Sequence, residues 1–278
     1  MPREEGVRTL RPDSDLAGNH KNEKQHRREL CLVGRWMYER GHIVACEGNV
    51  SVRLDDGRIL TTPTCMNKGM LEPEDLVVVD LEGRHLEGVR KASSEVLMHL
   101  LFYRMRRDVH AICHAHPPTA TGFAAAGRAL DQALLPEVVI GLGKVPLVRY
   151  ATPGTPELSA AIEPYVQNYD ALLLANHGAV TCGPDLLTAF YRMETIEHTA
   201  KITLAAEKAG TPKLFSSREV AKLMAARTRY GVQSPPGGAA DLPVTSDEED
   251  SVTDQITLKR DELDALIEDA VRKDRARR

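Results

Sequence analysis

Two histidines separated by one residue, His114 and His116, offer the clearest chemistry in this sequence. They end an apolar run from Val109 that is typical of a β-strand, in which side chains two positions apart project from the same face. A third histidine, His177, follows another apolar run and precedes Gly178, which lets the backbone turn closely around a site. Each histidine alone could be an ordinary core or surface ring. Together, three imidazoles with an open position favour a catalytic Zn²⁺ site.

The segment Ser93-Ser94-Glu95 is a second candidate site. Two hydroxyls and the first amide groups of a helix attract phosphate or carboxylate, because those N–H groups lack partners and the helix dipole is positive there. In the plainer interpretation, Glu95 only complements that dipole in the first turn of the helix. The plainer interpretation is favoured for an isolated Ser-Ser-Glu, and the two can hold together.

Weaker candidates are residues 48–51 (Gly-Asn-Val-Ser) and 61–64 (Thr-Thr-Pro-Thr). Glycine, asparagine and hydroxyl residues at strand ends usually form turns, and they also expose backbone N–H groups to a phosphate. Glu194, Glu197 and His198 share one side of a long helix, where a second metal site is conceivable. A solvated face or a subunit contact is the favoured interpretation there.

The elements that position these groups follow from apolar periodicity and turn signals, which predict one α/β domain. Expected helices cover about residues 23–41, 93–107, 117–126, 155 onward, 185–209 and 216 onward. Expected strands cover about residues 49–54, 57–62, 76–80, 109–114, 171–174 and 179–181. Both histidine motifs therefore lie at strand ends.

Composition narrows the class of protein. The 278 residues are 42% hydrophobic and 27% charged, with a formal net charge of −4, which indicates a soluble globular protein without a nucleic-acid footprint. The sequence shows neither an apolar run near the roughly 20 residues of a membrane span nor a signal-peptide core at residues 1–15, so we expect a cytoplasmic protein. Five scattered cysteines without a CxxC pair predict no disulfide framework.

Four segments are expected along the chain. Residues 1–22 are polar and predict a mobile arm, and residues 23–233 form the catalytic domain. Residues 234–256 contain a Pro-Pro-Gly-Gly cluster and the acidic run SDEED, which is typical of a flexible linker. Residues 257–278 carry apolar side chains at helical spacing and predict an amphipathic tail helix.

Six ordered motifs resemble one family. They are GNVSVR (48–53), LTTPT (60–64), SSEVLMH (93–99), DVHAICHAHP (108–117), YATPGTPELS (150–159) and ANHGAVTCG (175–183). This set is similar to the class II aldolases and adducin head domains, over about residues 28–210. The resemblance implies an α/β/α sandwich around a mostly antiparallel sheet. It also implies a four-fold cyclic homotetramer with active sites at subunit interfaces.

The resemblance also implies roles for individual residues. His114, His116 and His177 would hold Zn²⁺, and Glu95 would be the acid/base beside it, or a ligand when the site is empty. A substrate phosphate would lie among Gly48, Asn49, Thr64, Ser93 and Ser94.

This chain departs from the family pattern at four places. Cys65 stands in the phosphate loop where glycine is usual, and Cys46 and Glu47 precede Gly48 where a small or hydroxyl residue is more typical. The stretch after the HxH helix has Glu137 and no tyrosine, so Glu137 is a candidate proton donor. Tyr230 is the candidate for a C-terminal tyrosine that reaches a neighbouring subunit.

The leading hypothesis from the sequence is a Zn²⁺-dependent aldolase that cleaves a ketose 1-phosphate. It would yield dihydroxyacetone phosphate and an aldehyde through a metal-stabilised enediolate. The departures above also fit a sugar-phosphate epimerase, dehydratase or decarboxylase that uses the same site. Another transition metal could replace zinc, because histidine ligands accept several. A non-catalytic, adducin-like assembly domain is less favoured, because it need not retain three histidines and Glu95.

Overall fold

A central sheet organises the computed structural model, which describes residues 21–230 and 242–244. Its strands are β1 (Asn49–Arg53), β2 (Ile59–Thr61), β3 (Val77–Val79), β4 (His85–Glu87), β5 (Ala111–Ala115), β6 (Leu147–Val148), β7 (Ala171–Leu174) and β8 (Gly178–Gly183). Their order is β4-β3-β2-β1-β5-β8-β7-β6, and only β6 and β7 pair in parallel. The prediction of a mostly antiparallel sheet is confirmed.

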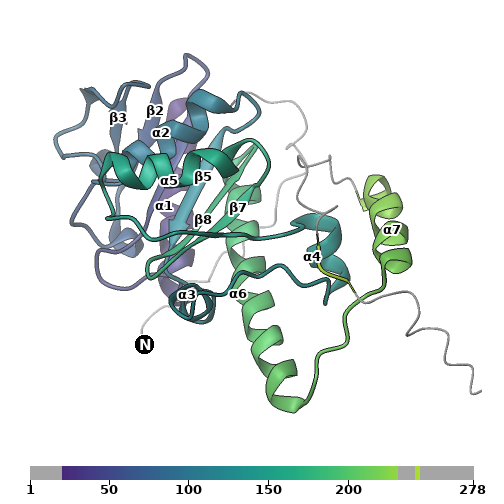
Figure 1. Ribbon diagram of the computed structural model, residues 1–278. Coiled ribbons are helices and arrows are strands. Elements are labelled where there is room, and N and C mark those ends of the chain that lie inside the picture. The colour runs from purple at the N-terminus through teal and green to yellow at the C-terminus, as the bar shows by residue number, and fades with distance from the viewer. Residues whose placement is uncertain (1–20, 231–241, 245–278) are drawn as a thin grey trace, which may run out of the picture.

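Helices cover both faces of this sheet (Figure 1). One layer contains α2 (Val96–Met105) and α5 (Pro156–Val166), and the other contains α1 (Glu23–Glu39), α3 (Pro118–Ala125) and α6 (Leu186–Ala209). The helices α4 (Pro136–Gly141) and α7 (Ser217–Ala226) pack against each other beside these layers. Short 3₁₀ turns cover Lys68–Met70, Pro73–Asp75 and Arg227–Tyr230.

The alternation of side chains along β5 decides which layer each one meets. Ala111 and Cys113 are buried in the cluster beneath α1 and α6, whereas Ile112 is buried in the cluster beneath α2 and α5. His114 shares the parity of Ile112, so its side chain belongs to the α2 face of the sheet. The predicted strand character of this segment is confirmed.

The start of α2 differs from the prediction. The helix begins at Val96, and Glu95 occupies the N-cap position instead of the first turn. Ser93 Oγ accepts a hydrogen bond from the Glu95 amide at 3.2 Å, so the serine pair forms a turn before the helix. The strands β4 and β6 were not predicted, because two or three residues are too few to show a period. The helix expected from residue 216 onward is confirmed, and a capping box formed by Ser216 and Glu219 begins it.

Three predicted segments fall largely outside the described residues. The expected arm lies there except for Lys21 and Asn22, and the expected tail helix lies there entirely. Of the expected linker only residues 242–244 are described, where Leu242 is 6% exposed in a small cluster with Ala133 and Val220. Within the described parts of the chain, no helix combines the length and apolar character that crossing a membrane requires.

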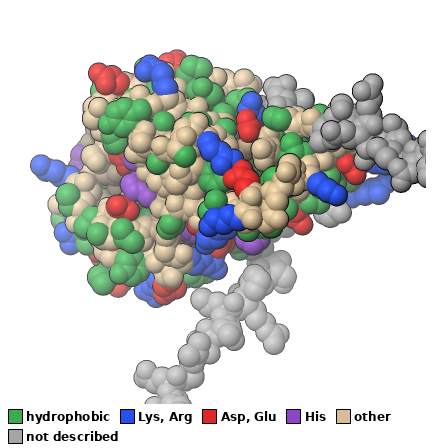
Figure 2. Space-filling model, turned by 60° about the horizontal axis from the view of Figure 1, so that its bottom comes forward, with side chains coloured by type: hydrophobic (Ala, Val, Ile, Leu, Met, Phe, Trp, Pro, Cys, Tyr) green, Lys and Arg blue, Asp and Glu red, His purple; other side chains and the backbone are tan. Residues whose placement is uncertain are grey.

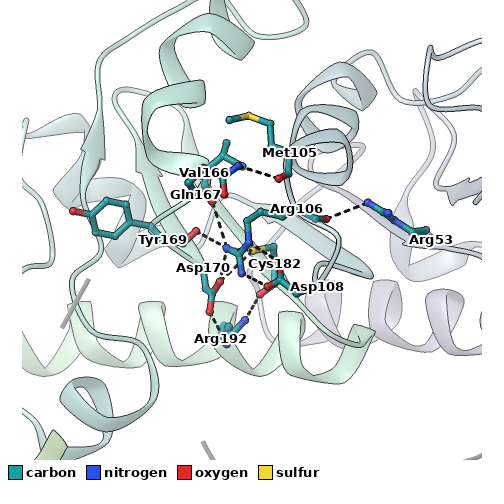
Figure 3. Close-up of polar contacts among 10 residues, drawn as sticks. All are labelled: Arg53, Met105, Arg106, Asp108, Val166, Gln167, Tyr169, Asp170, Cys182 and Arg192. Carbon is teal, nitrogen blue, oxygen red and sulfur yellow. Dashed lines mark hydrogen bonds and ion pairs between the residues drawn. The ribbon is translucent and has the colours of Figure 1, made fainter. Parts of the chain in front are cut away.

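At the end of β5, β7 and β8 opposite the histidines, a buried ion network joins four elements (Figure 3). Asp170 accepts from Arg106 and from Arg192, each at 2.7 Å. Arg106 also donates to the carbonyls of Val166 and Tyr169. These contacts connect the end of α2 and the end of α5 to α6, and they hold the two helical layers together at this end of the sheet.

Charge on the outer surface is mixed. The face that Figure 2 presents carries positive and negative side chains interspersed with apolar ones. This mixture agrees with the small formal net charge of −4. All five cysteines are free thiols, so the expectation that they form no disulfide framework is confirmed.

Candidate metal centre

Three histidines converge at the end of β5 and the start of β8. The centroids of the His114, His116 and His177 rings lie 4.7 to 5.0 Å apart. One nitrogen atom from each ring lies within 4.8 Å of the chosen nitrogen atoms of the other two rings. Within the described residues this is the only group of three or more metal-ligating side chains at such spacing. The prediction that the HxH pair and the distant histidine share one site is confirmed.

Contacts on the far side of two rings indicate which nitrogen faces the centre, a hydrogen bond for His114 and an ion-pair contact for His116. His114 Nδ1 lies 2.9 Å from the carbonyl oxygen of Ala179, and His116 Nδ1 lies 3.3 Å from a carboxylate oxygen of Glu47. An imidazole that donates from Nδ1 keeps the lone pair of Nε2 for a metal. The two Nε2 atoms are 3.2 Å apart. The donor set therefore fits a divalent metal ion bound by Nε2 atoms.

Glu95 completes the group of side chains. Its carboxylate oxygens lie 3.3 Å from His114 Nε2 and 3.1 Å from His177 Nε2, and one of them accepts from Asn49 Nδ2 at 2.9 Å. Burial would raise the pKa of Glu95, but attraction and hydrogen bonds from His114 and His177 outweigh it and hold the pKa far below its usual range. Glu95 is therefore ionised in the metal-free chain.

His116 differs from an ordinary surface histidine. Burial lowers its pKa to about 3, and the neighbouring charges of His114 and His177 act in the same direction. The ring is therefore neutral at physiological pH, which is the form that binds metals. Its side chain is still 22% exposed, so the centre can be reached from solvent.

Two glycines make this close approach possible. A Cβ atom at Gly178 would lie 2.5 Å from the Ala115 carbonyl oxygen and 2.5 Å from the His116 ring. Gly48 has a φ of +65°, and a Cβ there would lie 2.8 Å from the His114 carbonyl oxygen. A larger residue at either position would displace the strand that carries the histidines.

The residues expected to bind an anion differ in their exposure. Asn49 and Ser93 are buried, Thr64 is half-buried, and Ser94 and Cys65 are exposed. Asn49 lies opposite His114 in the pairing of β1 and β5, and it already donates to Glu95. Its Oδ1 atom is buried without a hydrogen-bond partner.

Cys65 adopts a backbone conformation that favours glycine. Its φ is +56°, in the left-handed region that side chains with a Cβ rarely occupy. This geometry explains why glycine is usual at this place in the family motif. The exposed thiol lies 3.7 Å from Thr64 Oγ1. The loop therefore keeps the turn of the motif with a different side chain.

The structure does not bring Glu137 to the histidines of its own chain. Glu137 is exposed on α4 and lines a cavity of about 740 Å³ with residues of α6, which none of the three histidines lines. Tyr230 ends the last 3₁₀ turn, and its side chain lies outside the described part of the structure.

The interpretation of Glu197 as part of a solvated helix face is wrong. Its side chain is 2% exposed, and its carboxylate accepts from the amides of Thr119 and Ala120 at the start of α3. It balances the unpaired N–H groups of that helix. The alternative of a second metal site is not supported by the described residues, in which no ligand cluster includes Glu197.

Sequence reasoning missed the role of Glu47. The sequence shows it only as a departure from the family pattern before Gly48, whereas the structure pairs it with His116. The contact joins residues 69 positions apart in the chain, so local spacing carried no signal for it.

Comparison with known proteins agrees with this geometry. The profile of the Class II Aldolase and Adducin N-terminal domain matches residues 28–204. The chain is 39% identical over 186 residues to the 3-oxo-tetronate 4-phosphate decarboxylase of Haemophilus influenzae, which covers 64% of this chain and 88% of that protein. It is 35% identical over 178 residues to the L-fuculose phosphate aldolase of Methanocaldococcus jannaschii, which covers 64% of this chain and 95% of that protein.

A solved structure shares the fold as well. An L-fuculose 1-phosphate aldolase superposes with a TM-score of 0.70 at 32% identity, over 76% of this chain and 100% of that one. The chain belongs to the class II aldolase and adducin family, and its three histidines are consistent with the divalent metal site of class II aldolases.

Proposed function

We propose that this protein is a metal-dependent carbon–carbon lyase that decarboxylates a phosphorylated 3-oxo sugar acid, such as 3-oxo-tetronate 4-phosphate. The observation that carries the proposal is the contact of Glu95 with two of the three clustered imidazoles, at 3.1 and 3.3 Å. The similarity to 3-oxo-tetronate 4-phosphate decarboxylases supports the choice of substrate.

The side chains at the centre suit decarboxylation. When the bond to the carboxylate breaks, CO₂ leaves without a proton, and the electron pair stays on the carbon beside the ketone. That carbon then takes up one proton, which gives dihydroxyacetone phosphate. Aldol cleavage needs a second group as well, to remove the proton of the hydroxyl that becomes the aldehyde. Glu137, the candidate for such a group, lies on α4 away from the histidines of its own chain.

Glu95 is placed to transfer the single proton that decarboxylation requires. A divalent ion, when bound by His114, His116 and His177, supplies Lewis-acid stabilisation of negative charge on the ketone oxygen. Glu95 takes a proton from water in the site and gives it to the carbon that CO₂ has left. Asn49 orients the carboxylate by donating to it at 2.9 Å. We expect zinc as the native metal.

Phosphate recognition is assigned to the loops around the centre. The proposed contacts are Gly48, Asn49, Thr64, Cys65, Ser93 and Ser94. Ser94 offers an exposed hydroxyl just before α2, where the unpaired N–H groups of the helix also favour an anion. The buried and unpartnered Oδ1 of Asn49 can accept a hydrogen bond from a substrate hydroxyl.

Product analysis tests this function. The zinc-loaded protein is given 3-oxo-tetronate 4-phosphate and, separately, L-fuculose 1-phosphate, and CO₂, aldehyde and dihydroxyacetone phosphate are measured. We expect kcat/KM for CO₂ release to exceed that for aldehyde release by about 10–200-fold, which a difference of 1–3 kcal/mol in pocket contacts supplies. Faster aldehyde release would overturn the proposal.

A pair of variants assigns the chemistry to Glu95. Glu95→Gln keeps the size of the side chain but cannot transfer a proton, so product formation should stop while zinc stays bound. Glu207→Gln is the matched control, because Glu207 only pairs with Arg128 on the surface, and its activity should equal that of the wild type.

An aldolase is the second candidate function. It is favoured by the 35% identity to an L-fuculose phosphate aldolase and by the shared fold. Both reactions leave the same three-carbon phosphate fragment and need the same proton transfer to carbon. The product test above separates them, because only the aldolase releases an aldehyde.

We also propose a homotetramer with its active sites at subunit interfaces. Tyr230, the candidate for a C-terminal tyrosine, would then reach the site of a neighbouring subunit. Exposed apolar side chains such as Met70, which is 71% exposed, and Tyr191, which is 53% exposed, support burial in an assembly. Light scattering on the purified protein tests this, and a monomeric mass for an active enzyme would exclude it.

A further inference from the structure

A row of polar side chains runs between β1 and α2, through a layer that is otherwise apolar. Residues four apart on a helix are about 6 Å apart, which nearly matches two residues of a strand, so the two periodicities stay in step. We call this row the polar ladder; it contains Asn49, Ser51 and Arg53 on β1 and Glu95, His99 and Tyr103 at the start of and along α2.

A direct contact between β1 and α2 forms each rung of the polar ladder. Asn49 donates to Glu95 at 2.9 Å. Ser51 Oγ lies 2.7 Å from His99 Nδ1 and 2.7 Å from the hydroxyl of Tyr103. The guanidinium of Arg53 lies over the Tyr103 ring at 5.1 Å and donates to the Tyr103 carbonyl. Ser51, His99 and Tyr103 are all at most 1% exposed.

The polar ladder fixes the position of the proton on His99. Burial lowers the pKa of His99 to about 3 and raises that of Tyr103, so the ring is neutral and the phenol keeps its proton. If Tyr103 donates to Ser51, then Ser51 donates to His99 Nδ1, and the proton of His99 is on Nε2. The reverse direction would leave both the Tyr103 proton and the His99 Nε2 lone pair without a described partner.

We propose that Ser51, His99 and Tyr103 are positioning residues for Glu95. By holding His99 in the Nε2–H tautomer and fixing the start of α2 against β1, they align the Glu95 carboxylate with the histidines. The inference rests on the proposed role of Glu95 in proton transfer.

Stability alone does not account for the polar ladder. Burying hydroxyl and imidazole groups carries a desolvation penalty, and apolar side chains of similar shape would fill the layer at no such penalty. His99 also keeps a buried ring nitrogen without a described partner, next to the charges of His114 and Glu95 that act on its pKa. The polar ladder therefore fixes α2 against β1 at a point one helical turn from the Glu95 carboxylate.

The test compares Ser51→Ala with Thr181→Val. Thr181 is a matched control, because its buried hydroxyl also makes a 2.7 Å hydrogen bond, to the Ala189 carbonyl away from the ladder. The readout is zinc-dependent exchange of a dihydroxyacetone phosphate proton with deuterated water. We expect Ser51→Ala to lower the exchange kcat about 10–100-fold with little change in KM, as for other residues that orient a metal site. Thr181→Val should stay within about twofold of the wild type.

A second readout is independent of activity. Long-range proton–nitrogen NMR correlations report which ring nitrogen of His99 carries the proton, in the zinc-loaded protein. The wild type should show the proton on Nε2, and Ser51→Ala should show a mixture of the two tautomers. Tyr103→Phe, which keeps the ring and removes the donor, should show the same mixture with an intermediate loss of kcat.

Two results would overturn the inference: a proton on Nδ1 in the wild type, or a Ser51→Ala exchange rate equal to that of Thr181→Val. Failure of the proposed function has a different signature. If the wild type neither exchanges the proton nor forms product, then the lyase assignment fails, and the NMR result alone decides whether the ladder sets the tautomer.

Discussion

Strands β5, β7 and β8 have charged side chains at both ends, and the two groups are built differently. At one end Asp170 is held at 2.7 Å by Arg106 and at 2.7 Å by Arg192. At the other end three imidazoles lie together and two of them contact the Glu95 carboxylate, while Asn49 Oδ1 and His177 Nδ1 are buried without hydrogen-bond partners. We call these the ion-pair end and the histidine end.

The difference shows which end is prepared for a ligand. At the ion-pair end, the buried carboxylate is matched by two guanidinium groups within the chain, as a structural role requires (Figure 3). The histidine end gathers donors whose best partner is a cation that the chain does not supply. Arg53 connects the two, because it closes the polar ladder and donates to the Arg106 carbonyl at 3.2 Å.

The largest expected effect is on catalysis at the histidine end. His116→Ala removes one of three ligands from a partly exposed position, so the fold should persist while zinc binding is lost. Activity should fall about 10³-fold or more, because metal stabilisation is worth several kcal/mol at the transition state. Metal analysis and product assays on the purified variant check this, and a zinc-free variant with wild-type activity would contradict it.

A substitution at the ion-pair end should instead lower stability and leave catalysis unchanged. Asp170→Ala leaves Arg106, which is 6% exposed, without its buried carboxylate partner. We expect the free energy of unfolding to fall by about 3–5 kcal/mol, with zinc content and kcat of the folded protein unchanged. Urea unfolding and metal analysis measure the two quantities. Loss of zinc with unchanged stability would mean that the two ends are coupled rather than separate.

Asn49→Ala examines the support of Glu95. It removes the amide that donates to the carboxylate at 2.9 Å, so we expect a 10–100-fold lower kcat, with zinc retained. Steady-state kinetics with zinc analysis separate this from metal loss. A variant with unaltered kcat would show that the neighbouring imidazoles orient Glu95 by themselves.

Acid should destabilise the metal-free protein through the histidine end. His99 and His116 have pKa values lowered to about 3 in the folded chain, well below the value of about 6.5 for an unperturbed histidine. The unfolded chain therefore binds more protons below pH 6.5, and the stability from these groups is lost as pH falls. Burial alone would lower the pKa of His114, but its attraction and hydrogen bond to Glu95 raise it. His114 therefore opposes part of this loss of stability.

We expect the urea midpoint with a chelator present to fall between about pH 7.5 and about pH 5. His116→Ala should flatten this dependence, because it removes one of the two histidines at the histidine end whose pKa is lowered to about 3. A midpoint that does not change with pH would contradict the assignment of neutral, buried rings.

The smallest expected effect is on the free energy of unfolding when Arg106 loses its exposed partner instead of its buried one. Asp108 also pairs with Arg106, but its side chain is 68% exposed. Asp108→Ala should therefore change the free energy of unfolding by no more than about 1 kcal/mol. Urea unfolding beside Asp170→Ala gives the comparison, and equal losses would mean that exposure does not set the strength of these pairs.

Local patterns in the sequence were sufficient for much of the fold and part of the site. Alternation along β5 places His114 and His116 on one face, because the side-chain period of a strand is two residues. The capping residues Asp185 and Ser216 mark the starts of α6 and α7, since side-chain oxygens there meet unpaired amides. Local patterns also singled out His177 before a glycine and Glu95 after two serines, and the family motifs gave them roles, but no local period shows that either residue lies beside the pair.

The tertiary structure decided the contacts between distant segments. Sheet pairing placed Asn49 opposite His114, and the packing of α2 on β1 brought Glu95 between them. The fold also pairs Glu47 with His116, and it places Glu137 at a cavity that none of the three histidines lines. The sequence by itself determined which residues could bind a metal. Only the fold determined which of them meet, because strand pairing and helix packing set these distances and local periodicity does not.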